Sequence, residues 1–128
     1  MDLLLDTHAF LWWVGGAGQL SATARRAIAS PRNPCSLSLA SCWEMAIKVS
    51  LRKLRLGGSV DRFVPEQLAA NGFRLLEIDF ADVARVATLP FHHRDPFDRL
   101  LVVQASRRGL AVVSRDRTFE KYGVERIW

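Results

Sequence analysis

Residues 1–20 read MDLLLDTHAFLWWVGGAGQL, and the first half of this stretch is the part of the sequence that most clearly indicates the fold. Leu3, Leu4 and Leu5 form a short apolar run that stops at Asp6, which is typical of a strand buried on both faces. The apolar and aromatic residues 7–14 then predict a helix, and the glycine-rich segment 15–18 ends it. A buried strand that leads directly into a helix indicates an α/β protein.

The same alternation of strands and helices continues along the rest of the chain. Further strands are predicted at residues 35–39, 73–78 and 110–114, with an edge strand at 124–128. Further helices are predicted at residues 22–29, 41–54, 60–70, 80–88, 96–108 and 118–122. This order implies right-handed crossovers and a central, mainly parallel sheet of four to five strands that helices cover on both faces. Since the 128 residues contain no repeat or linker, we expect one domain, residues 1–128.

The composition is that of an ordinary globular protein, with 49% hydrophobic and 24% charged residues. The apolar runs are far too short to cross a bilayer. Asp2 directly follows Met1, so the sequence offers no basic start for a secretion signal. Cys35 and Cys42 lack metal-ligand spacing, and we expect them to stay reduced. We therefore expect a cytoplasmic protein that does not associate with membranes.

The chain is basic, with a formal charge of +5 and 15 arginines among its 18 basic residues. Arginine presents a planar fork of donors that matches the geometry of phosphate. The charge therefore favours an anionic partner, and nucleic acid is the commonest one. A basic surface that serves only solubility is the alternative.

Four acidic residues stand where an α/β sheet binds its ligands, beyond the carboxyl ends of the strands. Asp6 directly follows the first predicted strand, and Glu44 lies in the first turn of the helix after the second. Asp98 lies in the first turn of the helix before the fourth strand, and Asp116 is two residues past that strand. Four carboxylates in one cleft repel one another, and a hard divalent cation relieves that repulsion. Such an ion can polarise a phosphodiester and activate water.

Each of these acids has an alternative role as a helix cap, because acidic side chains are favoured at helix N-termini. Residues 41–44, SCWE, match the capping-box pattern, and Asp95 followed by Pro96 is a good N-cap. Thr7 and Ser114 stand beside the acids, where they either cap locally or orient a carboxylate or a metal-bound water. The catalytic interpretation therefore depends on whether the four acids converge.

Other side chains give weaker indications. The three histidines, His8, His92 and His93, are spaced too irregularly for a zinc site. Tryptophans can stack on bases, although packing in a core or a dimer is the commoner role, and the candidates are Trp12, Trp13 and Trp43. Neither a nucleophilic-serine motif nor a phosphate-binding loop is present.

Four segments, in the expected order, resemble the PIN-domain family and, within it, the VapC-type toxins. They are LLLDTH at 3–8, SCWEMAIK at 41–48, HRDPFDRLL at 93–101, and VSRD at 113–116 followed by Phe119. The most specific part is DPFDR, residues 95–99, and the resemblance covers nearly the whole chain. The sequence departs from the family in having Ser114 where Thr is usual, and the shared hydroxyl leads us to expect little change.

The resemblance implies an α/β/α sandwich and a metal-dependent endoribonuclease that uses Mg²⁺ or Mn²⁺ to cleave RNA. It implies that Asp6 and Asp98 are the principal metal ligands and that Asp116 completes the pocket, often through water. Glu44 would be either a ligand or the residue that positions the attacking water. The resemblance also implies a homodimer that acts as the toxin of a toxin–antitoxin pair, inhibited by a cognate antitoxin whose tail fills the cleft, in a dimer or a larger assembly.

Arginines close in sequence to the acids are expected to hold the RNA. They are Arg94, Arg99, Arg115 and Arg117. For Arg99, pairing with an acidic neighbour is an equal alternative.

Three other functions are compatible with parts of this pattern. A PIN-like nuclease acting on DNA, such as a flap-type enzyme, is disfavoured by the small size and the lack of large insertions. A catalytically inactive PIN-like binding subunit is disfavoured by the intact set of acids. A phosphoryl-accepting receiver-like domain needs paired acids after the first strand and an acceptor Asp after the third, which Asp6-Thr7 and Ile78-Asp79 do not supply.

Overall fold

The computed structural model describes every residue from Met1 to Trp128, and its strands form one sheet. The strands are β1 (Leu3–Leu5), β2 (Cys35–Ser38), β3 (Arg74–Leu76), β4 (Ala111–Val113) and β5 (Arg126–Ile127). All neighbouring strands are parallel, in the order β3-β2-β1-β4-β5. The chain therefore adds β2 and β3 on one side of β1, and then β4 and β5 on the other side. The carboxyl ends of β1 and β4 mark this reversal, where α/β sheets bind ligands.

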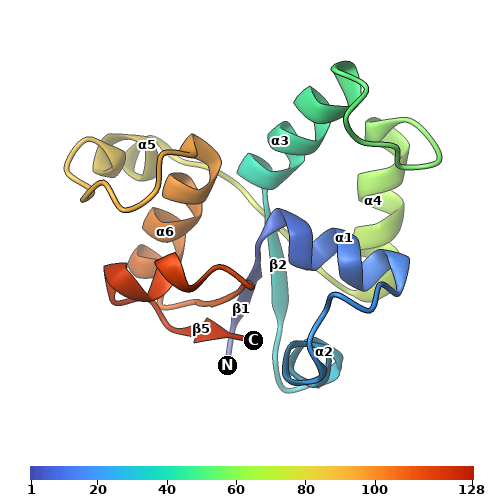
Figure 1. Ribbon diagram of the computed structural model, residues 1–128, viewed down its shortest axis with the longest axis horizontal. Helices are drawn as coiled ribbons and strands as arrows, with labels where there is room; N and C mark the ends of the chain where they lie inside the picture. The colour runs from blue at the N-terminus through green and yellow to red at the C-terminus, as the bar shows by residue number, and fades with distance from the viewer.

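Helices cover both faces of the sheet, so the predicted three-layer α/β/α architecture is confirmed (Figure 1). The α-helices are α1 (Thr7–Gly15), α2 (Ala22–Ala29), α3 (Leu39–Ser50), α4 (Val60–Asn71), α5 (Phe80–Val86) and α6 (Pro96–Arg108), and a 3₁₀ helix, η1, spans Arg117–Tyr122. In Figure 1, α1, α2 and α4 lie on one side of the strands and α5 and α6 on the other. No helix is both long and apolar enough to span a membrane.

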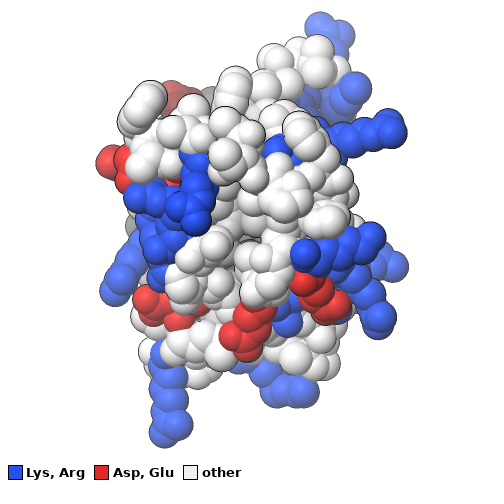
Figure 2. Space-filling view, turned by 90° about the vertical axis from the view of Figure 1, so that its left-hand side faces the viewer, with Lys and Arg blue, Asp and Glu red and all other residues white.

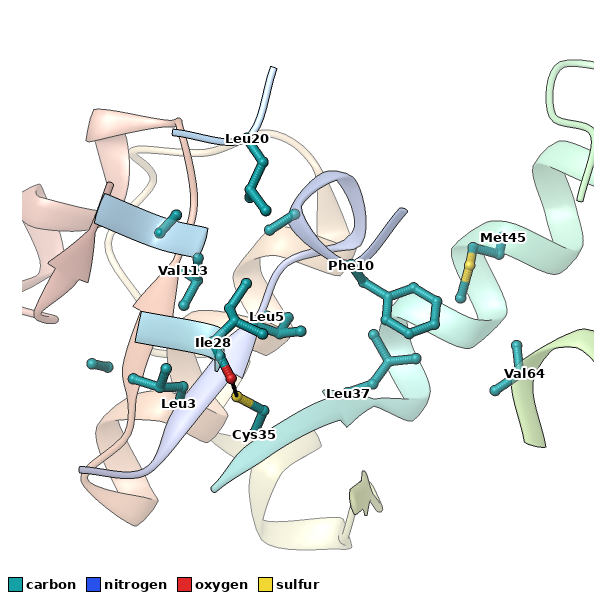
Figure 3. Packing of buried hydrophobic residues seen from close by; sticks show 13 residues of the cluster. Leu3, Leu5, Phe10, Leu20, Ile28, Cys35, Leu37, Met45, Val64 and Val113 are labelled. Carbon is teal, nitrogen blue, oxygen red and sulfur yellow. Dashed lines mark hydrogen bonds between the residues drawn. The ribbon is translucent and has the colours of Figure 1, made fainter. Parts of the chain in front are cut away.

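The side chains of β1 explain why both faces need cover. Leu3 and Leu5 belong to a buried cluster that includes Phe10 of α1, while Leu4 belongs to a second cluster with Leu101 of α6. All three leucines are fully buried, as the opening apolar run predicts. Figure 3 shows the first cluster, in which side chains from the sheet meet side chains from α1, α2, α3 and α4.

A buried polar network ties α5 and α6 to the end of β2. The Asp82 carboxylate is fully buried and accepts hydrogen bonds from the guanidinium groups of Arg107 and Arg108. Gln104 donates to Asp82 at 3.4 Å and accepts from the Ser38 hydroxyl at 2.5 Å. Because Ser38 is also the N-cap of α3, this network fixes the start of α3 relative to α6.

The start of α3 differs from the prediction. Ser38 caps the helix, and its Oγ accepts a hydrogen bond from the Ala40 backbone at 3.0 Å, so α3 begins directly after β2 with no intervening loop. Ser41 lies inside the helix, fully buried, and its Oγ has no hydrogen-bond partner. The expected capping box between Ser41 and Glu44 therefore does not form, and Glu44 lies in the second helical turn rather than the first.

The end of α3 and the state of the two cysteines can also be compared with the predictions. The helix predicted at 41–54 ends at Ser50, and Arg52 then adopts a left-handed backbone with φ of 58°. Cys35 and Cys42 are both free thiols, as predicted. Burial raises the pKa of each thiol to about 11, which keeps both in the unreactive protonated form at neutral pH.

Candidate functional site

Asp6 lies at the point where β1 passes into α1. Its backbone is extended and its N–H donates to the Val113 carbonyl of β4 at 3.1 Å. Its Oδ1 accepts from the Ala9 N–H at 2.8 Å, so Asp6 caps α1. Burial raises the pKa of Asp6, and hydrogen bonding to Ser114 partly opposes the rise. Asp6 is thus the N-cap of α1 and also a buried carboxylate at the point between β1 and β4 where the strand order reverses.

Glu44 reaches the same region from α3. The Thr7 hydroxyl donates to Glu44 Oε1 at 2.6 Å, and the Lys48 Nζ lies 2.7 Å from Oε2. Thr7 therefore does contact one of the predicted acids, across 37 residues of sequence. Lys48 was not singled out from the sequence, although it stands one helical turn after Glu44, the spacing at which helical residues meet. Both oxygens of this buried carboxylate have a donor.

Asp98 lies in the first turn of α6, three residues after the N-cap residue Asp95. Asp95 caps the helix as predicted, because its Oδ1 accepts from the backbone N–H groups of Phe97 at 2.8 Å and Asp98 at 3.4 Å. Burial raises the pKa of Asp98 to about 7. The charges of four neighbouring carboxylates add to the rise, and these belong to Asp95, Asp6, Glu44 and Asp116. Asp98 therefore lies close enough to Asp6, Glu44 and Asp116 for their charges to raise its pKa.

Asp116 follows β4 and caps η1. Its Oδ1 accepts from the Thr118 N–H at 2.9 Å, and its Oδ2 lies 2.7 Å from Nε2 of His93. Its own N–H donates to the Ser114 hydroxyl at 3.0 Å. Burial acts to raise the pKa of Asp116, but the hydrogen bonds from Thr118 and His93 outweigh it and hold the pKa below its ordinary value. One potential ligand atom from each of His93, Asp98 and Asp116 lies within 4.8 Å of the others.

The arrangement of donors fits a hard divalent cation. The Asp98 carboxylate accepts no hydrogen bond from the protein, so both its oxygens are free to bind an ion. Asp6 and Asp116 keep lone pairs beyond those used for capping. Carboxylate oxygens are the ligands that Mg²⁺ and Mn²⁺ prefer, and neutralising mutually repelling acids favours binding. Asp98 and Asp116 can therefore hold such an ion with ligand atoms within 4.8 Å of each other, whereas Asp6 and Glu44 lie outside that group.

Arg99 lies apart from the place predicted for it. The residue is only 5% exposed, and its guanidinium donates to three backbone carbonyls, those of Val86 at 3.3 Å, Leu89 at 3.0 Å and Pro90 at 3.0 Å. It also lies 4.1 Å from the centre of the exposed Phe91 ring. Arg99 therefore fastens the connection between α5 and α6 and is not free to hold RNA.

Cationic and aromatic side chains surround a groove next to Glu44. The groove, between α3 and the start of α6, has a volume of about 420 Å³, and its walls include Lys48, Lys53, Arg94 and Phe97. Trp43 is 58% exposed and meets the Phe97 ring edge-on, with ring centres 5.2 Å apart. Of the three tryptophans considered from the sequence, it is the only one so exposed. The groove thus has three cationic and two acidic lining residues, and the exposed Trp43 lies beside it through its contact with Phe97.

The other two tryptophans pack within the protein. Trp12 stacks on His8 and contacts Trp128, with ring centres 5.4 Å and 5.8 Å apart. Trp13 Nε1 donates to Asn71 Oδ1 at 2.9 Å. The packing role considered for these residues therefore agrees with the structure.

A family model described as the PIN domain matches residues 3–125. Three solved structures have a similar fold. VapBC2 from Rickettsia felis, bound to a DNA fragment from its promoter, has a chain with a TM-score of 0.72 and 12% identity, and the match covers all of both chains. FitAB bound to an IR36 DNA fragment has a TM-score of 0.67 and 18% identity over 97% of this chain and 92% of the other. FitAcB from Neisseria gonorrhoeae has a TM-score of 0.66 and 20% identity over 97% and 95%. No curated protein sequence matches the chain significantly.

Proposed function

Because the chain belongs to the PIN-domain family, whose members are generally nucleases, we propose that it is an endoribonuclease that depends on Mg²⁺ or Mn²⁺. The observation that carries the proposal is the meeting of carboxylates from separate segments of the chain, since ligand atoms of Asp98 and Asp116, together with His93, lie within 4.8 Å of one another. Asp98 feels the charges of Asp6, Glu44 and Asp116, and burial among them raises its pKa to about 7. Repulsion among these carboxylates lowers the stability of the metal-free protein, and a bound divalent cation relieves it.

Each acid has a specific role in this proposal. Asp6, Asp98 and Asp116 bind the ion, which when bound polarises the phosphodiester and makes water a better nucleophile. Glu44, whose two oxygens contact the Thr7 hydroxyl and the Lys48 ammonium, orients the attacking water. Thr7 and Lys48 keep Glu44 in that orientation. The water oxygen bonds to phosphorus and the bond from phosphorus to a ribose oxygen breaks; one proton of the water passes to a carboxylate or to solvent, and the departing ribose oxygen takes up a proton from solvent.

The groove beside Glu44 supports RNA as the substrate. Lys53 and Arg94 supply donors for phosphates and the exposed Trp43 supplies a ring on which a base can stack. Arg115 and Arg117 are exposed on either side of Asp116, in agreement with the binding role expected for them. Figure 2 shows that Lys and Arg side chains project around the face that carries α5 and α6, with Asp and Glu side chains among them in its lower half.

Cleavage of matched RNA and DNA oligomers tests the proposal. The wild type should cut RNA with Mg²⁺ or Mn²⁺ and not with a chelator. Asp98→Asn and Asp6→Asn keep side-chain shape while removing a charged ligand, and each should lower the rate by about 100-fold or more. Asp61→Asn, at an exposed position in α4, is the matched control and should cut normally. RNA cleavage by both site variants at the wild-type rate would contradict the proposal.

The same experiment separates the alternatives. Cleavage of DNA in preference to RNA would indicate a PIN-like DNase. Absence of any metal binding in calorimetry would indicate a binding subunit without activity. Binding of Mn²⁺ by the wild type that is lost in Asp98→Asn would support the proposed ligands independently of substrate.

We further propose that this activity serves as the toxin of a toxin–antitoxin pair in the cytoplasm, with the chain as a homodimer. The resemblance to VapC-type toxins and the fold shared with VapBC2 and FitAB support this role. The tail of a cognate antitoxin would place a basic side chain among the acids. Induced expression should stop bacterial growth, Asp98→Asn should not, and co-expression of the product of the adjacent upstream gene should restore growth. Light scattering of the purified chain reports whether it is a dimer.

A further inference from the structure

His93 is held in place by contacts of its ring and of its backbone. Its side chain is 7% exposed, and its ring lies parallel to that of Tyr122, with centres 5.5 Å apart and an angle of 2°. Phe119 contacts the ring from another direction, at 4.9 Å between centres. The backbone N–H of His93 also donates to the Tyr122 hydroxyl at 2.7 Å. The segment that leads into α6 is thereby attached to η1, the helix that Asp116 caps.

The two ring nitrogens of His93 have different surroundings. Nε2 lies 2.7 Å from Oδ2 of Asp116, whereas Nδ1 is buried and has no hydrogen-bond partner. A carboxylate can only accept, so the hydrogen between the two residues belongs to Nε2. The other tautomer would set two acceptors against each other at 2.7 Å and would bury an Nδ1–H without an acceptor. The neutral ring therefore carries its hydrogen on Nε2 and donates it to Asp116.

This assignment bears on whether His93 could itself hold an ion with Asp98 and Asp116, as their 4.8 Å spacing allows. A histidine binds metal through a nitrogen without hydrogen, and its other nitrogen almost always donates to an acceptor. Nδ1 of His93 has no acceptor. The ring is consequently suited to hold a carboxylate and poorly suited to bind the ion.

We propose that His93 is a positioning residue that holds Asp116 in the orientation needed at the metal site. Its Nε2–H holds Oδ2 and the Thr118 N–H holds Oδ1, so donors on both oxygens fix the carboxylate next to Asp98. His93 also joins two parts of the site that are remote in sequence, since it precedes Asp98 by five residues and contacts Asp116 across 23. The inference rests on the proposed nuclease function, because it assigns Asp116 to the metal site.

Three variants separate positioning from packing. His93→Gln places an amide N–H near the position of Nε2, whereas His93→Leu fills the space without a donor. His92→Leu is the matched control, because His92 is exposed and also contacts the Tyr122 ring but not Asp116. We expect His93→Leu to need about 10- to 100-fold more Mn²⁺ for half-maximal cleavage. His93→Gln should recover most of that affinity, and His92→Leu should match the wild type. Equal loss in the Gln and Leu variants would overturn the proposal.

Two measurements do not depend on cleavage. Calorimetric Mn²⁺ titration of the same variants should show the same order of affinities, and wild-type affinity in His93→Leu would overturn the proposal. ¹⁵N NMR of the wild-type histidines should show His93 with hydrogen on Nε2, with and without Mg²⁺. Hydrogen on Nδ1 in place of Nε2, or loss of the Nε2 hydrogen when Mg²⁺ is added, would overturn the proposal, even if His93→Leu fails to fold. A wild type that binds Mn²⁺ yet leaves RNA intact would contradict the nuclease function alone.

Discussion

Replacing Asp98 with Asn should make the metal-free protein more stable at pH 8 and remove its response to metal. The structure supplies the reason, since burial and the nearby carboxylates raise the pKa of Asp98 to about 7, against an ordinary value of 3.8. Each pH unit of that gap corresponds to about 1.4 kcal/mol, so the full gap is about 4 kcal/mol. Asp98 keeps some contact with solvent, which screens its charge, and we therefore expect about half, ~2 kcal/mol.

The pH dependence follows from the sign of the change. The folded chain holds the Asp98 proton more tightly than the unfolded chain, so this residue reduces stability as pH rises from about 4 to about 7. Above pH 7 the reduction is complete, and below pH 4 it is absent. Asp98→Asn carries no such charge. The difference in stability between Asp98→Asn and the wild type should therefore be absent below pH 4, grow between pH 4 and pH 7, and have its full size at pH 8.

Thermal unfolding at pH 4 and pH 8, with and without Mg²⁺, measures the effect. For a chain of 128 residues, ~2 kcal/mol corresponds to a Tm about 8 °C higher for the variant at pH 8. Saturating Mg²⁺ should raise the Tm of the wild type, by the equivalent of about 2.7 kcal/mol at 100 times Kd, and leave the variant almost unchanged. Asp61→Asn should follow the wild type throughout. A variant less stable than the wild type at pH 8, or an equal difference at pH 4 and pH 8, would refute this account of the site.

Three further predictions concern residues outside the metal ligands. Asp82 is fully buried, and hydrogen bonds chiefly from Arg108 hold its pKa well below the ordinary value despite the opposing effect of burial. Asp82→Asn should therefore cost about 3 kcal/mol at pH 7 by urea unfolding, and the cost should shrink as pH falls below 4, where the wild-type carboxylate loses its advantage; a cost that does not change with pH would contradict this. Arg99→Ala should lower stability by about 2 kcal/mol, because three carbonyls lose their donor, and weaker RNA binding at unchanged stability would show that Arg99 holds RNA after all. Trp43→Ala should weaken binding of a short RNA by about 10-fold with little effect on Tm, and unchanged affinity would remove the groove from the RNA path.

Most of the sheet could be predicted because its strands are buried on both faces. Leu3, Leu4 and Leu5 have no polar alternation, which only a strand covered on both sides tolerates in a protein of this size. The start of α3 was harder to predict from the sequence, because Ser41 and Glu44 match the capping-box pattern. The pattern does not say that Ser38, at the end of β2, already supplies the cap, and that difference turns Glu44 toward Thr7 and Lys48.

At the site, too, the order of the elements along the chain indicates where the acids lie but not which side chains contact them. Asp6, Glu44, Asp98 and Asp116 could be selected from the sequence because parallel strands bring their carboxyl ends, and the N-termini of the helices that pack on them, to one edge of the sheet. The partners of these acids could not be found in this way. His93 meets Asp116 through the path of the segment before α6, and Arg99 turns to the carbonyls of residues 86–90 for the same reason. Such loop paths depend on packing that no short sequence pattern records.

The strand order has a consequence during synthesis. β1 leaves the ribosome before β2 and β3, whereas its partner β4 and the carboxylate of Asp116 emerge after both of these strands. A nascent chain can therefore pair β1 with β2 long before the fourth acid arrives. In terms of the proposed function, a nascent chain is not an active nuclease until the segment that carries Asp116 has emerged and β4 has paired with β1.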